Sequence, residues 1–366
     1  MRVKFLKLAI NKSPELKKNL KLFKKFLLNG TFVLGKDVEK FERKISVYVD
    51  KKYTLGVSSG TNALYLALKS INIKKDDEVI VPCLSWYSTF TAVAMTGAKP
   101  IGIDINDDYL INPHEIEKKI SKKTKALIVV HFTGLIKNMD LIKKICKVNK
   151  IFLIEDCAQS FGSIYKGKKA GYFGDVSAFS MNPMKVLSSF GESGAVSTSN
   201  KKIYEKIKIL RYAGVNIKKD ECIYPDLNHK IDTLQALVIS NKLNSLKSII
   251  KKRITNASFY NKFISAKIIK PEFYKNFQHI YYTYQIRCSK RDQLLKFLRK
   301  RGVETKIQHR KLLCDHIGFK KSKKGPFVNA RKIINESLCI PIHERLSKND
   351  LFYITKNINM FAKKYL

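Results

Sequence analysis

Short apolar runs alternate with segments of helical periodicity through the first two thirds of the chain. The runs predict β-strands at residues 53–57, 78–82, 100–105, 126–131, 151–156, 176–180 and 194–198. Helical periodicity lies between them, for example at residues 61–69 and 140–148. Because strand and helix alternate, we expect a mostly parallel sheet that helices cover on both faces.

A different pattern begins near Asp232. Apolar residues at helical spacing predict a long helix that leaves this first domain; they are Leu234, Leu237, Ile239, Leu243, Leu246 and Ile249. The remaining pattern predicts strands at residues 280–288 and 303–308, and helices at residues 291–301, 328–338 and 348–366. We therefore expect a large domain at residues 1–250 and a smaller C-terminal α+β domain at residues 251–366.

Composition narrows the class of protein. The 366 residues are 45% hydrophobic, which is ordinary for a globular chain. No apolar run approaches the roughly 20 residues of a membrane span, and the N-terminal segment lacks the features of a signal peptide, so a cytoplasmic protein is expected. The seven cysteines are scattered and contain no CxxC pair, so we expect neither a disulfide framework nor a bound metal.

The charge is extreme, with 71 Lys and Arg against 30 Asp and Glu and a formal net charge of +41. Such a charge invites the hypothesis of a nucleic-acid-binding protein. The lysines are spread through nearly every predicted helix, however, and aromatic residues do not alternate with them in one stripe. A lysine-biased surface explains the charge better, and an anionic substrate is compatible with either view.

Ligands of open α/β sheets collect at the carboxyl ends of the strands, so polar residues there are the first candidates. The sequence Ser58-Ser59-Gly60-Thr61 follows the first predicted strand and leads directly into a helix. The free N–H groups of a first helical turn favour an anion such as phosphate, and glycine permits close approach. The alternative is an ordinary Ser/Thr helix cap.

The apolar run at residues 151–154 ends in Glu155-Asp156. A carboxylate at the tip of a buried strand is costly unless a cation meets it. Asp156 could hold a protonated ring nitrogen, with Gln159 donating an amide hydrogen bond nearby; a helix N-cap is the competing interpretation. Trp86, the only tryptophan, follows the second predicted strand and could stack on an aromatic ligand, although a lone tryptophan is more often a core residue.

Lys185 lies five residues after Ser180, at the end of another predicted strand. A lysine in a loop is ordinarily a solvated surface charge. Enclosed near an apolar sheet end, its neutral amine is instead a nucleophile for carbonyl groups. An anion site, a buried acid, an aromatic plate and a lysine at one sheet edge together match the needs of pyridoxal 5'-phosphate.

The order and spacing of several segments carry a resemblance that runs nearly end to end. The segments include NGTFVLGKDVEKFE, VSSGTNALYLAL, VVHFTG, IEDCAQSFGSIYKGKKAGYFGDVSAFSMNPMK, FGESGAV and SLCIPIHERLSKND. The chain resembles the DegT/DnrJ/StrS family of nucleotide-sugar aminotransferases. The resemblance implies an aspartate-aminotransferase-like α/β fold, the fold type I of pyridoxal-phosphate enzymes, with a large domain of mixed, mostly parallel sheet and a smaller C-terminal α+β domain.

The resemblance also implies roles for single residues. Lys185 would bind the cofactor as a Schiff base, and Asp156 would pair with the pyridine nitrogen. The remaining cofactor contacts would come from Gly60, Thr61, Trp86, Gln159 and Ser180. Family members complete each phosphate site with an asparagine from the neighbouring subunit in a motif like G-Y-N-x-R, which implies a homodimer with shared active sites.

This chain departs from that motif, because its corresponding stretch is DLNHKID. Asn228 matches, whereas Asp226 and Lys230 replace the usual glycine and arginine. His309 lies where the family often shows H-Y-P-x-x-L-H and would line the substrate pocket, with a surface histidine as the alternative. For His131, both contact with substrate and simple packing stay open.

The implied reaction is amino transfer from glutamate to a keto group of a nucleotide-linked deoxyhexose, for surface-glycan or related amino-sugar biosynthesis. Three alternatives stay open at this point. Dehydratases of the same family carry histidine in place of the lysine, so Lys185 argues against that activity. An aminotransferase of a non-nucleotide compound such as a keto-inositol fits the same motifs, and the charge alone suggests a basic nucleic-acid-binding regulator.

Overall fold

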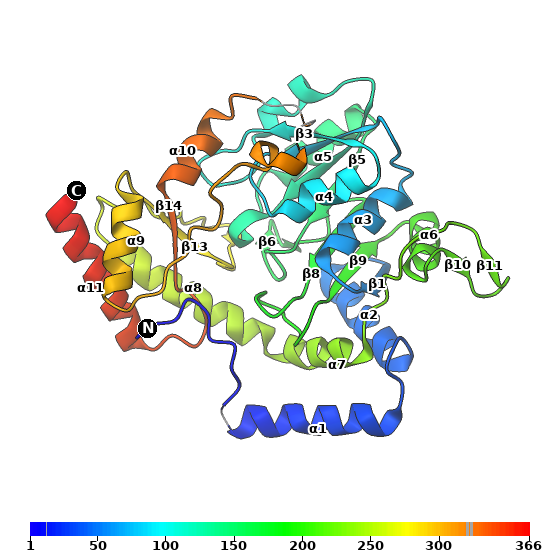
Figure 1. Cartoon of the computed structure of the whole chain (residues 1–366), viewed down its shortest axis with the longest axis horizontal. Helices are drawn as coiled ribbons and strands as arrows, with labels where there is room; N and C mark the ends of the chain where they lie inside the picture. Colours follow the sequence, from blue (N-terminus) through cyan, green and yellow to red (C-terminus); the bar gives the residue numbers. More distant parts are fainter. Residues whose placement is uncertain (12, 320–321, 323–324) are drawn as a thin grey trace.

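The computed structural model describes residues 1–11, 13–319, 322 and 325–366. At the centre of this described part is a seven-stranded sheet with the order β1-β9-β8-β5-β4-β2-β3 (Figure 1). The strands are β1 (Tyr53–Val57), β2 (Glu78–Pro82), β3 (Lys99–Ile103), β4 (Thr124–Val130), β5 (Phe152–Asp156), β8 (Val176–Ser180) and β9 (Gly194–Thr198). β9 runs antiparallel to both its neighbours and the other pairs are parallel, so the predicted mostly parallel sheet is confirmed.

Helices cover both faces of the sheet, as the pattern predicts. The helices α3 (Gly60–Ser70), α4 (Tyr87–Met95) and α6 (Lys201–Arg211) pack on one face, where Val79 and Val81 of β2 point. The helices α2 (Lys36–Val49), α5 (Met139–Val148) and α7 (Thr233–Lys242) pack on the other face, where Ile80 points. Because successive side chains of a strand point to opposite faces, one apolar strand supplies both cores.

The C-terminal part builds a third core. It is formed by α8 (Leu246–Phe263), α9 (Arg291–Lys300), α11 (Lys348–Tyr365) and the antiparallel pair of β13 (Tyr284–Arg287) and β14 (Ser337–Ile340). Val3 of the N-terminal segment also belongs to this core. The predicted boundary at residue 250 falls inside α8, so the division into domains 1–250 and 251–366 stays a prediction.

Three predictions in this part were wrong in detail. The single long helix after Asp232 is divided into α7, the 3-10 helix η4 (Leu243–Ser245) and α8. Residues 303–308 form isolated bridges from Val303 to Val3 and from Lys306 to Cys339, not a strand. The predicted helix 328–338 is α10 (Val328–Glu336), because the chain turns extended at Ser337 to pair with β13. Pairing with a distant strand overrides local periodicity here.

The remaining helices and strands lie around these layers. They are α1 (Ser13–Asn29), β6 (Ile164–Tyr165), β7 (Lys168–Lys169), β10 (Val215–Asn216), β11 (Glu221–Cys222), β12 (Phe277–Gln278), η1 (Pro113–Glu115), η2 (Glu117–Lys119), η3 (Phe132–Gly134), η5 (Leu313–Asp315) and η6 (Ile317–Phe319). α1 lies outside the helices that cover the sheet, alongside α7 (Figure 1). All seven cysteines are free thiols. Among the described residues, no helix combines the length and the apolar character that crossing a membrane requires.

Candidate active site

The strands β1, β2, β4, β5 and β8 have their carboxyl ends on the same side of the sheet, here called the carboxyl edge. Most of the candidate residues lie there. α3 begins at this edge, directly after β1. Its N-cap Ser59 accepts a hydrogen bond from the Asn62 N–H at 3.1 Å, and the Thr61 and Ser88 hydroxyls are 2.6 Å apart. The alternative of a Ser/Thr helix cap thus holds for Ser59. The cap and an anion site are compatible, since one cap satisfies only one of the free N–H groups of the turn.

Gly60 lies against Ser180 at the end of β8. A Cβ atom placed on Gly60 would be 2.5 Å from the Ser180 Cβ, closer than real side-chain atoms approach. The glycine therefore brings the first turn of α3 and the Ser180 hydroxyl together in a way that no other residue permits. The resulting group of N–H and hydroxyl donors at Gly60, Thr61 and Ser180 is here called the cradle, and its chemistry suits a phosphate.

Asp156 ends β5 as a buried carboxyl group that is 5% exposed. Its oxygens accept hydrogen bonds from the Ala158 N–H at 3.1 Å and the Thr89 hydroxyl at 3.2 Å. Burial raises the pKa of Asp156, and the Ala158 N–H and the positive charge of Lys185 oppose this effect only in part. Among the described residues, no cation lies close enough to compensate for the burial of this acid, and such an environment favours the binding of a positively charged group.

Lys185 is half-buried in a loop that β8 leads into. Asn182 shapes this loop, because its backbone oxygen accepts from the Lys185 N–H at 3.0 Å and its side chain accepts from the Met184 N–H at 3.0 Å. The Lys185 Nζ lies 4.8 Å from the ring centroid of Tyr282. The lysine is thus held against an aromatic ring from the C-terminal part, not extended into solvent.

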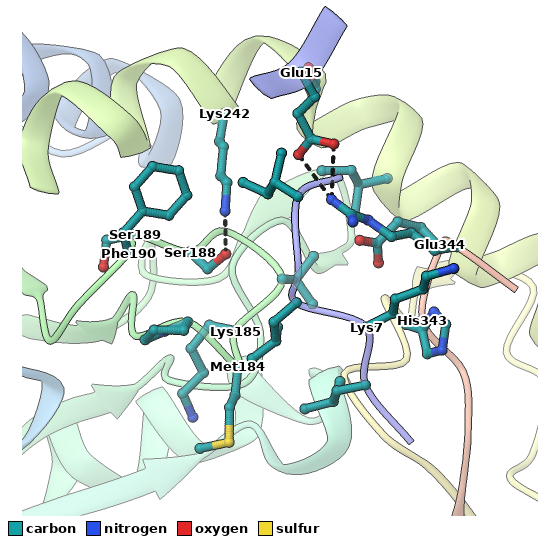
Figure 2. A pocket seen from close by; sticks show the side chains of 18 of the residues that line it. Lys7, Glu15, Met184, Lys185, Ser188, Ser189, Phe190, Lys242, His343 and Glu344 are labelled. Carbon is teal, nitrogen blue, oxygen red and sulfur yellow. Dashed lines mark hydrogen bonds and ion pairs between the residues drawn. The ribbon is translucent and has the colours of Figure 1, made fainter. Parts of the chain in front are cut away.

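A cavity of about 620 Å³ lies beside the loop that carries Lys185 (Figure 2). Its walls come from the N-terminal segment, residues 183–190, the α7–α8 junction and residues 343–345. Lys242 reaches across from α7 and donates to the Ser188 Oγ at 2.9 Å. Arg345 ties the N-terminal segment down through two bonds to Glu15, at 2.9 and 3.0 Å. The loop that carries Lys185 is therefore tied to α7 through the Lys242–Ser188 hydrogen bond.

Gln159 and Trp86 are two further candidate residues at the carboxyl ends of the strands. Gln159 is buried, and its Oε1 accepts from the Thr133 N–H at 2.8 Å, which leaves the amide NH₂ group to donate elsewhere. Trp86 is 50% exposed at the start of α4, so it is not a core residue. Its ring centroid is 6.2 Å from that of His309 in an edge arrangement.

His309 is buried rather than on the surface, with 9% exposure, and its Nε2 has no hydrogen-bond partner in the described part of the chain. Burial, with the charges of Lys306 and His316, lowers its pKa to about 4. The alternative of a surface histidine is therefore wrong. Its place beneath Trp86 is compatible with a pocket wall, but contact with substrate stays a prediction.

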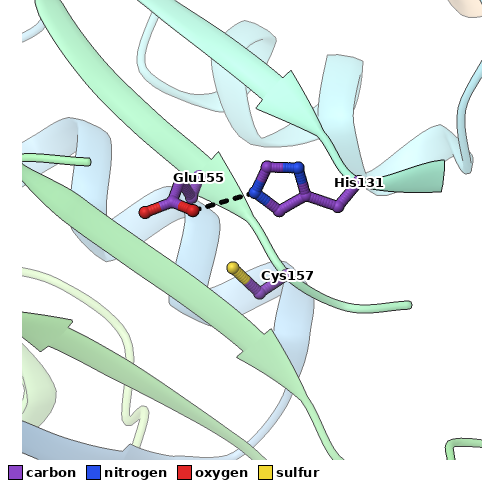
Figure 3. A group of neighbouring side chains, drawn as sticks. All are labelled: His131, Glu155 and Cys157. Atoms are coloured by element: carbon purple, nitrogen blue, oxygen red, sulfur yellow. Dashed lines mark hydrogen bonds and ion pairs between the residues drawn. The ribbon is translucent and has the colours of Figure 1, made fainter. Parts of the chain in front are cut away.

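His131 points toward Glu155, the neighbour of Asp156 in β5, with 2.8 Å between Nε2 and Oε2 (Figure 3). The Glu155 carboxylate also accepts from the Gly174 N–H at 2.6 Å and the Gly171 N–H at 3.1 Å. Burial raises the pKa of Glu155, but the bond and charge of His131 and the Gly174 N–H hold it below its ordinary value. Cys157 lies close enough to form a potential metal-ligand trio with them. Since the carboxylate oxygens are already occupied by N–H donors, the trio has the character of a packed hydrogen-bond cluster.

Asn228 is the candidate that stands apart. It is exposed, and its Oδ1 accepts from the Lys230 N–H at 3.2 Å. Lys230 lies over the Tyr212 ring at 3.9 Å and forms a bridge with Val57, next to the cradle. Within the described residues, the Asn228 side chain makes no hydrogen bond to the other candidates, so it is free to reach a neighbouring molecule.

Sequence reasoning missed some residues of this edge. Ser88 pairs with Thr61 and Tyr282 covers Lys185. Ser88 lies in the stretch around Trp86, where its hydroxyl could have been considered. No local signal marks Tyr282, because a segment nearly a hundred residues away brings it to the lysine.

Comparison with known proteins agrees with this geometry. The sequence profile of the DegT/DnrJ/EryC1/StrS aminotransferase family matches residues 15–359. The chain is 31% identical to the dTDP-3-amino-3,6-dideoxy-alpha-D-galactopyranose transaminase of Aneurinibacillus thermoaerophilus, over 92% of this chain and 93% of that protein. It is also 31% identical to the GDP-perosamine synthase of Escherichia coli O157:H7, over 91% and 93% of the two chains.

Among solved structures, the fold is similar to that of S. venezuelae DesV in complex with a ketimine intermediate. The TM-score is 0.95 at 28% identity, and the match covers 100% of this chain and 99% of that one. The expected aspartate-aminotransferase-like fold is thereby confirmed.

Proposed function

Because the chain belongs to the DegT/DnrJ/EryC1/StrS aminotransferase family, we propose that it transfers an amino group from glutamate to a keto group of a nucleotide-linked deoxyhexose. Aminotransferases of this family depend on pyridoxal phosphate, so the chain is a pyridoxal-phosphate-dependent aminotransferase. The choice of donor, the kind of sugar and the residues that act are the proposal.

One observation carries the proposal. Asp156, a buried acid without a compensating cation, ends the strand next to the one whose loop carries Lys185. The cradle of N–H and hydroxyl donors lies at the same edge, between β1 and β8. The pyridine ring of the cofactor needs an acid at its nitrogen, an amine at its aldehyde and donors at its phosphate. The residues present therefore fit the group.

Each residue has a role in holding the cofactor. The cradle, Gly60 with Thr61 and Ser180, binds the phosphate. Asp156 keeps the ring nitrogen protonated, Gln159 donates its amide to the ring hydroxyl, and Trp86 stacks on the ring. The Lys185 amine would hold the cofactor covalently at its aldehyde carbon, and the aldehyde oxygen would leave as water.

When bound, the cofactor supplies an electron sink for the bonding pair of the donor's Cα–H bond. The Lys185 Nζ, freed when the amino donor takes its place, would be the base that removes the Cα proton and the acid that returns it. Asp156 holds the positive charge of the ring nitrogen throughout, because its burial gives the carboxylate no competing water. The second half-reaction runs these proton steps in reverse on the keto sugar.

Nucleotide sugars are the acceptor class that the relatives support, since one relative is named for a dTDP-linked sugar and another for GDP-perosamine. The strongly basic chain favours a ligand that carries a diphosphate. Asn228, exposed and beside its own cradle segment, completes the phosphate site of a second subunit in a homodimer.

The test separates the two half-reactions by absorbance. Glutamate added alone is expected to convert the cofactor spectrum to its aminated form, and a keto sugar linked to dTDP, UDP or GDP is expected to restore it. The Lys185→Ala variant is expected to show neither change. A wild-type protein that retains no bound visible chromophore after addition of pyridoxal phosphate and removal of the unbound cofactor would contradict the proposal.

A further inference from the structure

The segment that carries Asn228 is tied to α3 by a buried network that the proposed reaction does not use. The Asp226 Oδ2 accepts a hydrogen bond from the Tyr65 hydroxyl at 3.3 Å. The Asp226 Oδ1 lies 3.1 Å from the His229 Nε2, and the side chains of Asp226 and His229 are only 3% and 1% exposed. Tyr65 lies one turn after the cradle residue Thr61, so the network ends on the helix that begins at the cradle.

Backbone hydrogen bonds join the same two parts. The Ser58 N–H donates to the His229 oxygen at 2.9 Å, and the His229 N–H donates to the Arg211 oxygen at 3.1 Å. Arg211 in turn donates to the Gly56 oxygen at 3.2 Å. Residues 226–230 are thus attached both to the strand that leads into the cradle and, through Tyr65, to the helix that leaves it.

The network surrounds the buried Asp226 carboxylate with hydrogen-bond donors, which a loop that only connects two elements would not require. A buried carboxylate is costly unless donors surround it, and Asp226 has three in Tyr65, His229 and the Leu227 N–H at 2.8 Å. Burial, together with the charge of Asp226, raises the pKa of Tyr65 to about 12, which keeps its hydroxyl a donor. The family motif usually has glycine at position 226, and glycine could make none of these side-chain bonds.

We propose that Tyr65, Asp226 and His229 are positioning residues that lock the Asn228 segment to α3. The cradle of one subunit and the asparagine that it lends to its partner then form one rigid unit. The inference rests on the proposed roles of the cradle and of Asn228. It implies that the network acts on the phosphate end of the cofactor and not on its ring.

The test compares two ligands that differ only in the phosphate. Apo protein is titrated with pyridoxal phosphate and with pyridoxal, and the variants are Tyr65→Phe and Asp226→Asn. Loss of one hydrogen bond predicts that Tyr65→Phe weakens pyridoxal phosphate binding by about threefold to tenfold. Pyridoxal binding is expected to stay unchanged. Tyr353→Phe, which removes a hydroxyl bonded to the Arg301 oxygen at 2.9 Å far from this segment, is the matched control.

A second measurement does not depend on the cofactor. Amide hydrogen exchange of residues 226–230 in the apo protein is expected to be faster in Tyr65→Phe than in the wild type or in Tyr353→Phe. Equal weakening of both ligands, no weakening of either, or unchanged exchange would overturn the inference. A wild-type protein that binds neither ligand would refute the proposed function, and the exchange result would then decide alone whether the network holds the segment. Tyr65→Phe removes a single hydroxyl, so the test stands even if Asp226→Asn fails to fold.

Discussion

At the scale of single residues, the central pair is Asp156 and Lys185, which lie at the ends of neighbouring strands. The acid ends β5 and the lysine follows β8, its neighbour in the sheet. The charge of Lys185 already lowers the pKa of Asp156 in part, against the stronger effect of burial. A cationic ring nitrogen placed at Asp156 would compensate the remaining cost of burying that carboxylate.

Asp156→Asn keeps the size of this side chain and removes its charge. We expect cofactor to bind still, through Lys185 and the cradle, while the single-turnover rate with glutamate falls by roughly 10²–10³-fold, because one preorganised electrostatic contact is lost. Asp140→Asn is the matched control, since Asp140 is exposed and pairs with Lys166 at the surface. Equal rates in the wild type and Asp156→Asn would show that the acid does not act on the ring.

His309 gives a prediction about pH. Burial lowers its pKa from 6.5 to about 4, so between these values the unfolded chain binds a proton that the folded chain does not. The contribution of His309 to the free energy of unfolding is therefore fully present above pH 6.5, and it is lost as the pH decreases toward 4. His309→Gln should flatten this dependence by up to about 1.4 kcal/mol per pH unit, measured by urea unfolding at pH 7 and pH 5. An identical pH dependence in both proteins would argue that His309 is protonated in the folded state.

At the scale of elements, the first turn of α3 connects helix formation to ligand binding. Helix propensity alone would favour alanine over glycine at position 60. The close approach to Ser180 decides against it, because a Cβ would lie 2.5 Å from the Ser180 Cβ. The glycine is thus explained by packing at the cradle and not by the helix.

Gly60→Ala is therefore expected to weaken pyridoxal phosphate binding by about fivefold or more. Overpacking of this kind costs about 1–3 kcal/mol, which outweighs the gain in helix propensity. Gly318→Ala is the control, because no atom of the described residues lies within 4 Å of a Cβ at that position. Fluorescence titration of the apo proteins measures the effect, and unchanged affinity in Gly60→Ala would contradict the assigned contact.

The elements also show how far the sequence alone can reach. The seven central strands could be predicted from apolar runs. A strand that is buried on both faces is apolar along its whole length, and this pattern can be seen without knowing which strand it pairs with. The C-terminal part was less predictable. Ser337 ends a helix only because β13 lies beside it, and residues 303–308 have strand-like periodicity but form only isolated bridges.

The site divides in the same way. Lys185, Asp156 and Gly60 each follow a predictable strand, so the sheet edge brings them together. Tyr282 and the Tyr65–Asp226–His229 network depend on tertiary packing between distant segments, which no local pattern encodes.

At the scale of the whole molecule, the proposal requires two copies of the chain. Asn228 is exposed and makes no bond to the other candidates in the described part of the chain, although it lies beside the cradle segment. A shared site places it in the partner's cradle. The basic surface then serves both subunits by attracting anionic substrate.

Mixing two inactive variants tests this arrangement. Lys185→Ala and Asn228→Ala are each expected to have little activity as pure proteins. In a mixed dimer, one site combines the lysine of the Asn228→Ala chain with the asparagine of the Lys185→Ala chain and is complete. We expect unfolding and refolding of the mixture to restore up to about a quarter of wild-type activity, because half of the dimers are mixed and each has one intact site of two. No recovery above the sum of the pure variants would place Asn228 in its own subunit's site.

The central claim, that Lys185 binds the cofactor covalently, has a direct test. The protein is incubated with pyridoxal phosphate, reduced with borohydride, digested and examined by mass spectrometry. The account predicts a reduced cofactor adduct on Lys185 and none on the neighbouring lysines of the same digest. An adduct spread over surface lysines, or an unmodified Lys185 peptide, would contradict it.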